Sequence, residues 1–278
     1  MTETTRDAFF GGRVRVRQHR RGYRFSVDAV LLAHGAARRP AARVLDLGTG
    51  CGIVPLLLAA RRPGARIWGV EIQDALARLA AENVRENGLE DRIEIRNMDM
   101  REIDRGLTGG SVDLAVANPP YRPAGSGRRC PDGERDVARH EIRIDLAGVI
   151  AAARRMLDPG GRFLIVYPAE RSAELLDRMR GAGIEPKRFR PVYSRAGEPA
   201  RLVLVEGRRG GNAGLRLEAP LFVREPDGAY SAETAAMFRL GASAGEDRDG
   251  SVPVFPPESR TRAGPRARPD GPSRSPYP

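Results

Sequence analysis

The segment Arg43-Val44-Leu45-Asp46-Leu47-Gly48-Thr49-Gly50-Cys51-Gly52 decides the fold of this chain. Its apolar residues predict a short buried strand, its glycines predict a tight turn, and the apolar run 53–60 predicts a helix. Glycine lets the backbone approach a ligand closely, because it lacks a Cβ atom and tolerates positive φ. The spacing Gly-x-Gly-x-Gly differs from the dinucleotide fingerprint and lacks the Lys-Ser/Thr of a phosphate loop. We therefore predict a nucleotide-cofactor site at this turn.

A second strand, predicted over 112–117, ends in Asn118-Pro119-Pro120-Tyr121. Proline lacks a backbone N–H and fixes φ, so the strand stops here and the chain turns outward. Amide and carbonyl oxygens accept hydrogen bonds from an NH2 group, and a tyrosine ring offers a flat face for stacking. These groups are typical of a clamp for a planar amine, such as the exocyclic nitrogen of adenine or a carboxamide. The alternative is a plain turn between a strand and a loop.

Carboxylates follow two further predicted strands. Glu71 follows strand 65–70 and lies 21 residues after Gly50, near the spacing at which a carboxylate meets the ribose hydroxyls of a nucleotide. Asp99 follows strand 92–96 and is a candidate acceptor for the adenine amine of the cofactor. The alternatives are a surface cap for Glu71 and, for Asp99, the N-cap of a short helix over 101–105.

The remaining pattern predicts an α/β fold with a seven-stranded, mostly parallel sheet and helices on both faces. Three more strands are expected over 162–167, 187–193 and 200–206, the first after a turn at 158–161. Ser26 is a candidate N-cap for a helix over 29–33, and further helices are expected over 75–87, up to 157, over 169–180 and over 231–240. The chain divides into a basic N-terminal β extension (1–27), a main domain (28–240) and a Pro/Arg-rich tail (241–278) that we expect to be disordered.

The charge of the chain favours a polyanionic partner. Its 278 residues carry a net charge of +11, and Lys187 is the sole lysine, so arginine supplies nearly all the positive charge. Arginine grips phosphates bidentately and stacks on bases, which favours RNA. Cys51 and Cys130 have no metal-ligand or disulfide spacing, so we expect no metal and a cytoplasmic protein. No apolar run is long enough for a membrane span, and we expect a monomer.

Two arginine-rich segments are candidate RNA contacts. The segment Arg13-Val14-Arg15-Val16-Arg17 alternates as a half-exposed strand does, and Arg24 and Phe25 follow it. The second segment, 121–143, is rich in Gly, Pro and Arg and is a candidate lid over bound RNA. For both segments the alternative is a solvated surface.

Several motifs together resemble the bacterial valine-tRNA adenine-N6 methyltransferases, which are class I S-adenosylmethionine-dependent enzymes. The resemblance covers roughly residues 7–240 and is most specific up to Glu206. Its motifs are Gly11-Gly12, Gly22–Ala33, Asp46–Gly52, Asn118–Tyr121, Ala138-Arg139-His140-Glu141 and Gly161–Arg171.

The resemblance implies a cofactor, a substrate and a set of site residues. It implies S-adenosylmethionine as cofactor and, as substrate, the purine just 3′ of a tRNA anticodon. The implied catalytic residues are Asn118, Pro119, Pro120 and Tyr121. The implied cofactor site comprises Asp46, Gly48, Thr49, Gly50, Gly52, Glu71, Asp99, Asn118 and Phe25. The implied RNA site comprises Tyr121, Arg122, Arg139, His140 and Arg24.

Two other functions fit parts of the sequence. The release-factor glutamine methyltransferases use a similar Asn-Pro-Pro-Tyr, but they usually carry a helical domain before the glycine loop, which here begins near residue 46. An RNA-binding module that has lost catalysis is the second alternative. The insert at 125–133 and the tail depart from the family pattern and leave the RNA target open.

Overall fold

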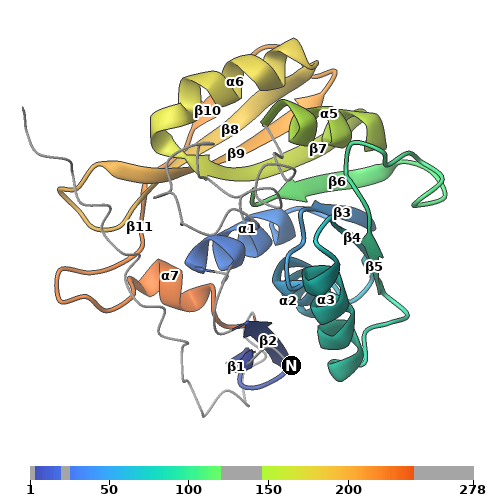
Figure 1. Cartoon of the computed structure of the whole chain (residues 1–278). Helices are drawn as coiled ribbons and strands as arrows, with labels where there is room; N and C mark the ends of the chain where they lie inside the picture. Colours follow the sequence, from blue (N-terminus) through green and yellow to red (C-terminus); the bar gives the residue numbers. More distant parts are fainter. Residues whose placement is uncertain (1–3, 20–25, 120–145, 241–278) are drawn as a thin grey trace, which may run out of the picture.

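The computed structural model of the chain describes residues 4–19, 26–119 and 146–240. Within these residues a nine-stranded sheet carries helices on both faces, and a separate two-stranded hairpin packs beside it (Figure 1). The strands run in the order β10-β8-β9-β7-β6-β3-β4-β5, and β11 also pairs with β8. The seven longer strands are β3 (Arg43–Leu47), β4 (Arg66–Glu71), β5 (Ile93–Asn97), β6 (Val112–Ala117), β7 (Leu157–Pro168), β8 (Ile184–Tyr193) and β9 (Ala200–Arg209).

The predicted seven-stranded, mostly parallel sheet is confirmed. Strands β3 to β7 are mutually parallel, and β9 runs antiparallel between β7 and β8. Strands β10 (Arg216–Leu217) and β11 (Leu221–Phe222) add two short parallel pairings along β8. The order of the parallel strands reverses at β3, which lies between β4 and β6, and in open sheets this is the position where ligands bind.

Helices cover the two faces of the sheet, each over its own apolar cluster. Leu32, Leu57 and Val84 of three helices join one cluster, whereas Ile150 and Met179 of two others join the second. The first face carries α1 (Val27–Ala37), α2 (Ile53–Arg61) and α3 (Asp74–Glu86); the second carries α5 (Leu146–Met156) and α6 (Ser172–Gly181), preceded by the short η1 (Ala169–Arg171). Ser26 caps α1 as predicted, since its hydroxyl accepts from the Asp28 N–H at 3.4 Å.

The N-terminal hairpin belongs to the first apolar cluster. Strands β1 (Thr4–Phe9) and β2 (Val14–His19) pair antiparallel, and the sequence had indicated one strand here. Val14 and Val16 are buried in the cluster that α2 and α3 also enter. The Phe9 ring stacks on Phe238, just after α7 (Ala232–Ala236), with centroids 6.3 Å apart. The hairpin is therefore held against the sheet domain by apolar packing.

Two local predictions were wrong. Residues 101–105 form turns and irregular chain rather than a helix, and the Arg101 N–H donates to the Asp99 carboxylate at 2.8 Å. Residues 158–161 lie inside β7, where the ladder with β6 shifts register between Val112 and Leu114. Asp158 is held there by Arg105 at 2.8 Å, a distant contact that a local turn pattern does not contain. Among the described residues, no helix is both long and apolar enough to cross a membrane.

Candidate active site

The glycine turn between β3 and α2 adopts a conformation that favours glycine. Gly48, Gly50 and Gly52 have φ of 78°, 58° and 83°, values that other residues rarely adopt. A Cβ atom on Gly52 would lie 3.2 Å from the Cβ of Ala80, so α3 also presses closely on the turn. The N–H groups of Gly48 and Thr49 both donate to the Val70 carbonyl, each at 2.9 Å, and tie the turn to β4. The result is a rigid backbone cradle at the carboxyl end of β3.

Glu71 lies against this cradle. Its Oε2 accepts from the Gly50 N–H and its Oε1 from the Gln73 N–H, both at 2.9 Å. The side chain is buried, and burial raises the pKa of Glu71, whereas the backbone donors of Gln73 and Gly50 oppose the shift. Each carboxylate oxygen can accept more than one hydrogen bond, so Glu71 keeps capacity for ribose hydroxyls.

Asp46 is the second buried carboxylate here. It lies near the end of β3 and is 1% exposed, and burial raises its pKa to about 7, with the Thr49 side chain opposing the shift. The neighbouring charge of Glu71 raises the pKa further. Within the described part of the chain, its Oδ2 has no hydrogen-bond partner. A buried acceptor without a donor costs free energy, so this atom is suited to a ligand that brings a donor.

Asp99 follows β5 and is engaged by its own neighbour. Arg101 donates to the Asp99 carboxylate from its backbone N–H at 2.8 Å and from Nε at 2.9 Å. The Arg101 side chain is the main reason why the pKa of Asp99 lies below its usual value. The short helix that Asp99 was predicted to cap in the alternative interpretation is not formed, and a contact with adenine would have to share the carboxylate with Arg101.

Strand register brings three of the predicted groups to one edge of the sheet. Leu47 of β3 pairs with Ala117 of β6 on one side and with Val70 of β4 on the other. The next residue along each strand is therefore Gly48, Asn118 and Glu71, respectively. Neighbouring strands lie about 4.8 Å apart, so the backbones of Asn118 and Glu71 flank the glycine turn at about 10 Å from each other. Asn118 is half-buried and Pro119 is buried.

The other predicted residues lie outside the described part of the chain. They are Arg24, Phe25, Pro120, Tyr121, Arg122, Arg139 and His140, together with the insert 125–133 and the tail from 241. In the segments that the structure describes, no group of three or more His, Cys, Asp or Glu residues is placed to hold a metal ion.

Two asparagines that fix the site were not predicted from the sequence. The Asn97 amide donates to the carbonyls of Glu71 and Ile72, at 2.9 and 3.1 Å, and fixes the chain after β4. Asn83 on α3 donates to the carbonyl of Cys51 in the glycine turn at 2.9 Å. An asparagine at a strand end was a usable signal for Asn97, but a helical pattern does not reveal where a buried asparagine points.

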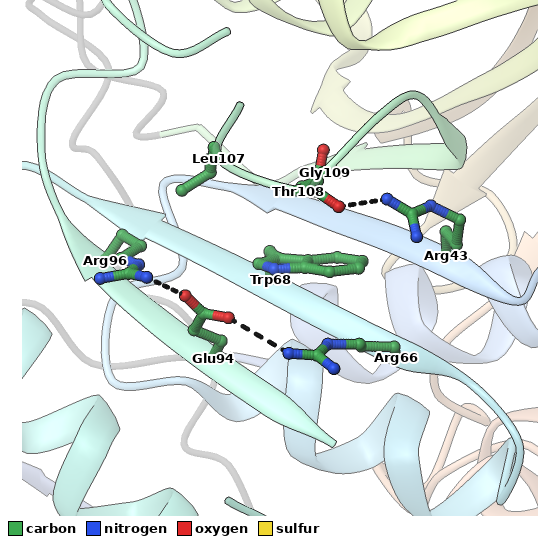
Figure 2. A pocket seen from close by; sticks show the side chains of 8 residues that line it. All are labelled: Arg43, Arg66, Trp68, Glu94, Arg96, Leu107, Thr108 and Gly109. Atoms are coloured by element: carbon green, nitrogen blue, oxygen red, sulfur yellow. Dashed lines mark hydrogen bonds and ion pairs between the residues drawn. The ribbon is translucent and has the colours of Figure 1, made fainter. Parts of the chain in front are cut away.

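A separate hollow of about 330 Å³ lies near the opposite ends of the strands (Figure 2). Arg43 and Arg66, which begin β3 and β4, place their guanidinium groups 5.0 and 5.4 Å from the centre of the Trp68 ring. Glu94 pairs with Arg66 at 3.6 Å and also with Arg96. The hollow is lined by three arginines and one carboxylate, so it carries excess positive charge, and it is distinct from the cradle at Gly48.

Comparisons with known proteins agree with this geometry. The family model described as methyltransferase small domain matches residues 26–181. A Bacteroides fragilis protein named tRNA1(Val) (adenine(37)-N6)-methyltransferase is 33% identical over 178 residues, 64% of this chain and 74% of the relative. A protein of the same name from Tolumonas auensis is 31% identical over 221 residues, 79% of this chain and 90% of the relative.

A solved structure supports the fold independently. The crystal structure of a predicted O-methyltransferase, protein Atu636 from Agrobacterium tumefaciens, superposes with a TM-score of 0.61 at 24% identity, and the match covers 76% of this chain and 94% of that one. The sheet, the glycine cradle and the matched relatives therefore lead to one conclusion: the chain belongs to the methyltransferase small domain family and has the class I methyltransferase fold.

Proposed function

We propose that this chain transfers a methyl group from S-adenosylmethionine to the exocyclic N6 amine of an adenine in tRNA, next to the anticodon. The observation that carries the proposal is the arrangement at one edge of the sheet. Leu47 is paired with Ala117 and with Val70 on the neighbouring strands, and the residues that follow these three are Gly48, Asn118 and Glu71. A carboxylate for ribose and an amide for a base amine thus flank the same glycine cradle. The relatives' names supply the substrate class and the position in the tRNA.

The residues of the cradle fit S-adenosylmethionine. The positive-φ glycines 48, 50 and 52 give the turn a conformation that other residues rarely adopt, and Glu71 is fixed against the Gly50 N–H. The buried Oδ2 of Asp46 lacks a donor among the described residues, and the cofactor carries an ammonium group that can supply one. We therefore assign cofactor binding to Asp46, the turn 48–52 and Glu71, with Asp99 as a further candidate for the adenine amine.

In the reaction, this chain's residues hold and orient the target amine. When bound, S-adenosylmethionine supplies an electrophilic methyl group on a positively charged sulfur. Asn118 Oδ1 and the Pro119 carbonyl accept hydrogen bonds from the two amine hydrogens, which directs the nitrogen lone pair at the methyl group. Orientation of this kind can contribute on the order of 7–11 kcal/mol. No strong base is required, because the amine proton becomes acidic only as the new N–C bond forms.

The hairpin is a candidate surface for RNA. Arg13 and Arg15 are exposed on its outer side, and the whole chain carries a net charge of +11. Arginines at such a surface bind phosphates and stack on unpaired bases. The adenine itself has to leave its stack before its amine can reach Asn118. A tRNA substrate also fits the expected cytoplasmic location.

The ionisation of Asp46 predicts a pH-dependent cofactor affinity. An ionised Asp46 binds the cofactor's ammonium group more tightly than a protonated one does. With a pKa of about 7, the ionised fraction of Asp46 rises about tenfold between pH 6 and pH 8, and the Kd for S-adenosylhomocysteine should fall by a similar factor. Calorimetric titration at pH 6, 7 and 8 measures this. An Asp46→Asn variant should bind weakly at every pH, and a variant that kept the wild-type slope would contradict the assignment.

Stability without cofactor should show the opposite trend. Between the ordinary carboxyl pKa and about pH 7, folded Asp46 retains a proton that the unfolded chain has released. The contribution of Asp46 to the free energy of unfolding therefore falls as the pH rises through this range. Asp46→Asn should remove this contribution, which melting curves at several pH values can measure.

The decisive comparison for substrate class is between RNA and protein. In both assays the purified protein is incubated with radiolabelled S-adenosylmethionine. One assay contains unmodified tRNA, and the other contains a release factor. We expect label in the tRNA alone. Label in a release-factor glutamine would favour the amide-methylating alternative, and cofactor binding with no label in either substrate would favour the RNA-binding module.

A further inference from the structure

Asn83 on α3 connects the N-terminal hairpin with the cofactor turn. It is fully buried, and both ends of its amide are bonded. Its Oδ1 accepts from the Arg17 N–H at 2.8 Å, and its Nδ2 donates to the Arg17 carbonyl and to the Cys51 carbonyl, both at 2.9 Å. One side chain thus bonds β2 and the glycine turn at the same time.

Asn87 repeats only the hairpin half of this arrangement. Its Oδ1 accepts from the Arg15 N–H at 2.9 Å and its Nδ2 donates to the Arg15 carbonyl at 2.7 Å. Asn83 and Asn87 are four residues apart on a helix, a rise of about 6 Å, and Arg15 and Arg17 are two residues apart on a strand, a rise of about 6.7 Å. The spacing of the two amides therefore matches alternate residues of β2. One edge of β2 pairs with β1. Along the other edge, side chains of helix α3 bond the backbone groups that a further strand would otherwise bond.

The contact with Cys51 continues into the proposed cofactor site. Cys51 lies between Gly50, whose N–H donates to Glu71, and Gly52, which packs on Ala80 of α3. Arg17 is further held by an ion pair with Glu86 at 2.7 Å, so the hairpin has a second anchor on the same helix. A displacement of β2 would therefore pull on the Asn83 amide and, through it, on the turn that holds Glu71.

We propose that Asn83 is a positioning residue for methyl transfer, which holds the arginine-bearing hairpin in fixed relation to the cofactor turn so that binding at either site stabilises the other. The inference rests on the proposed function, since it assigns RNA to the hairpin and S-adenosylmethionine to the turn. Linkage requires that the effect be reciprocal. Asn87 holds the same hairpin and donates also to the backbone carbonyl of Asn83 at 2.7 Å, but it bonds neither the Asn83 side chain nor the turn, which makes it the matched control.

Hydrogen exchange on the full-length wild-type protein tests the connection without a mutation. The probe is S-adenosylhomocysteine, and the reporters are the amides of residues 48–52 and of Arg17. We expect the cofactor product to slow exchange at the turn and also at Arg17, whose N–H is bonded to Asn83. Slowing at the turn with unchanged exchange at Arg17 would overturn the coupling alone. Unchanged exchange at the turn would overturn the cofactor assignment and the coupling with it.

Two variants separate positioning from simple structural support. Asn83→Ala leaves the Cys51 and Arg17 carbonyls and the Arg17 N–H without this partner, and the Kd for S-adenosylhomocysteine should rise about tenfold. Asn87→Ala should leave that Kd within about twofold, because none of its bonds reaches the turn. Both variants should weaken tRNA binding. Equal effects of the two variants on the cofactor Kd, at comparable melting temperatures, would contradict the proposal; if Asn83→Ala does not fold, the exchange experiment decides.

Discussion

Asn118→Ala is expected to abolish methyl transfer while leaving the cofactor Kd close to that of the wild type. Asn118 is half-buried at the end of β6, next to the glycine turn on β3. Loss of its side-chain oxygen removes one of the two acceptors assigned to the adenine amine. Removal of one well-placed hydrogen-bonding group from a reaction site commonly costs about 10²–10³ in rate, and we expect a loss of at least this size in single-turnover transfer to tRNA.

Asn118→Asp is the matched variant for this prediction. It preserves an oxygen acceptor at the same position and should retain measurable transfer, whereas Asn118→Ala should not. Calorimetry with S-adenosylhomocysteine checks that both variants still bind the cofactor product. A normal transfer rate in Asn118→Ala would show that the amide does not hold the target amine.

Glu71→Gln should weaken cofactor binding more than any other single change described above. Both carboxylate oxygens of Glu71 accept backbone N–H bonds, from Gly50 and Gln73. A glutamine would place its NH2 group against one of these two backbone N–H groups, where it cannot accept a hydrogen bond. Its single oxygen would then have to accept from the other N–H group and from the ribose hydroxyls. Hydrogen bonds to a charged group contribute about 1.5–3 kcal/mol each, so a rise in Kd of about 100-fold is expected.

Glu94→Gln on the neighbouring strand is the control for Glu71→Gln. Glu94 pairs with Arg66 and Arg96 at the hollow near the opposite strand ends, and its replacement should leave the cofactor Kd within about twofold, since such exposed ion pairs contribute little. Calorimetric titration and a melting curve are needed for each variant. A folded Glu71→Gln protein with wild-type affinity would remove Glu71 from the cofactor site.

The central part of the fold was predictable because local and long-range preferences agree there. Strands β3 and β6 begin and end at the predicted residues, since each is a short apolar run bounded by glycine or proline. The meeting of Glu71 with the glycine turn was also predictable, because parallel strands place their carboxyl ends at one edge. The roles of Asn118, Asp99 and the residues outside the described segments stay predictions.

The parts that were not predictable depend on contacts between distant residues. The segment 158–161 looked like a turn, yet Arg105 and Ser111 hold Asp158 within β7. Asn83 gave no signal, because its bonds reach 32 residues back to Cys51 and 66 residues back to Arg17.

The target atom and nucleotide can be identified by mass spectrometry of nucleosides from a tRNA incubated with the purified protein and isotopically labelled S-adenosylmethionine. We expect labelled N6-methyladenosine, mapped by nuclease digestion to the purine after the anticodon and missing when Asn118→Ala replaces the wild type. Label on any other atom or nucleotide, or an unlabelled tRNA after prolonged incubation with cofactor-binding protein, would contradict it.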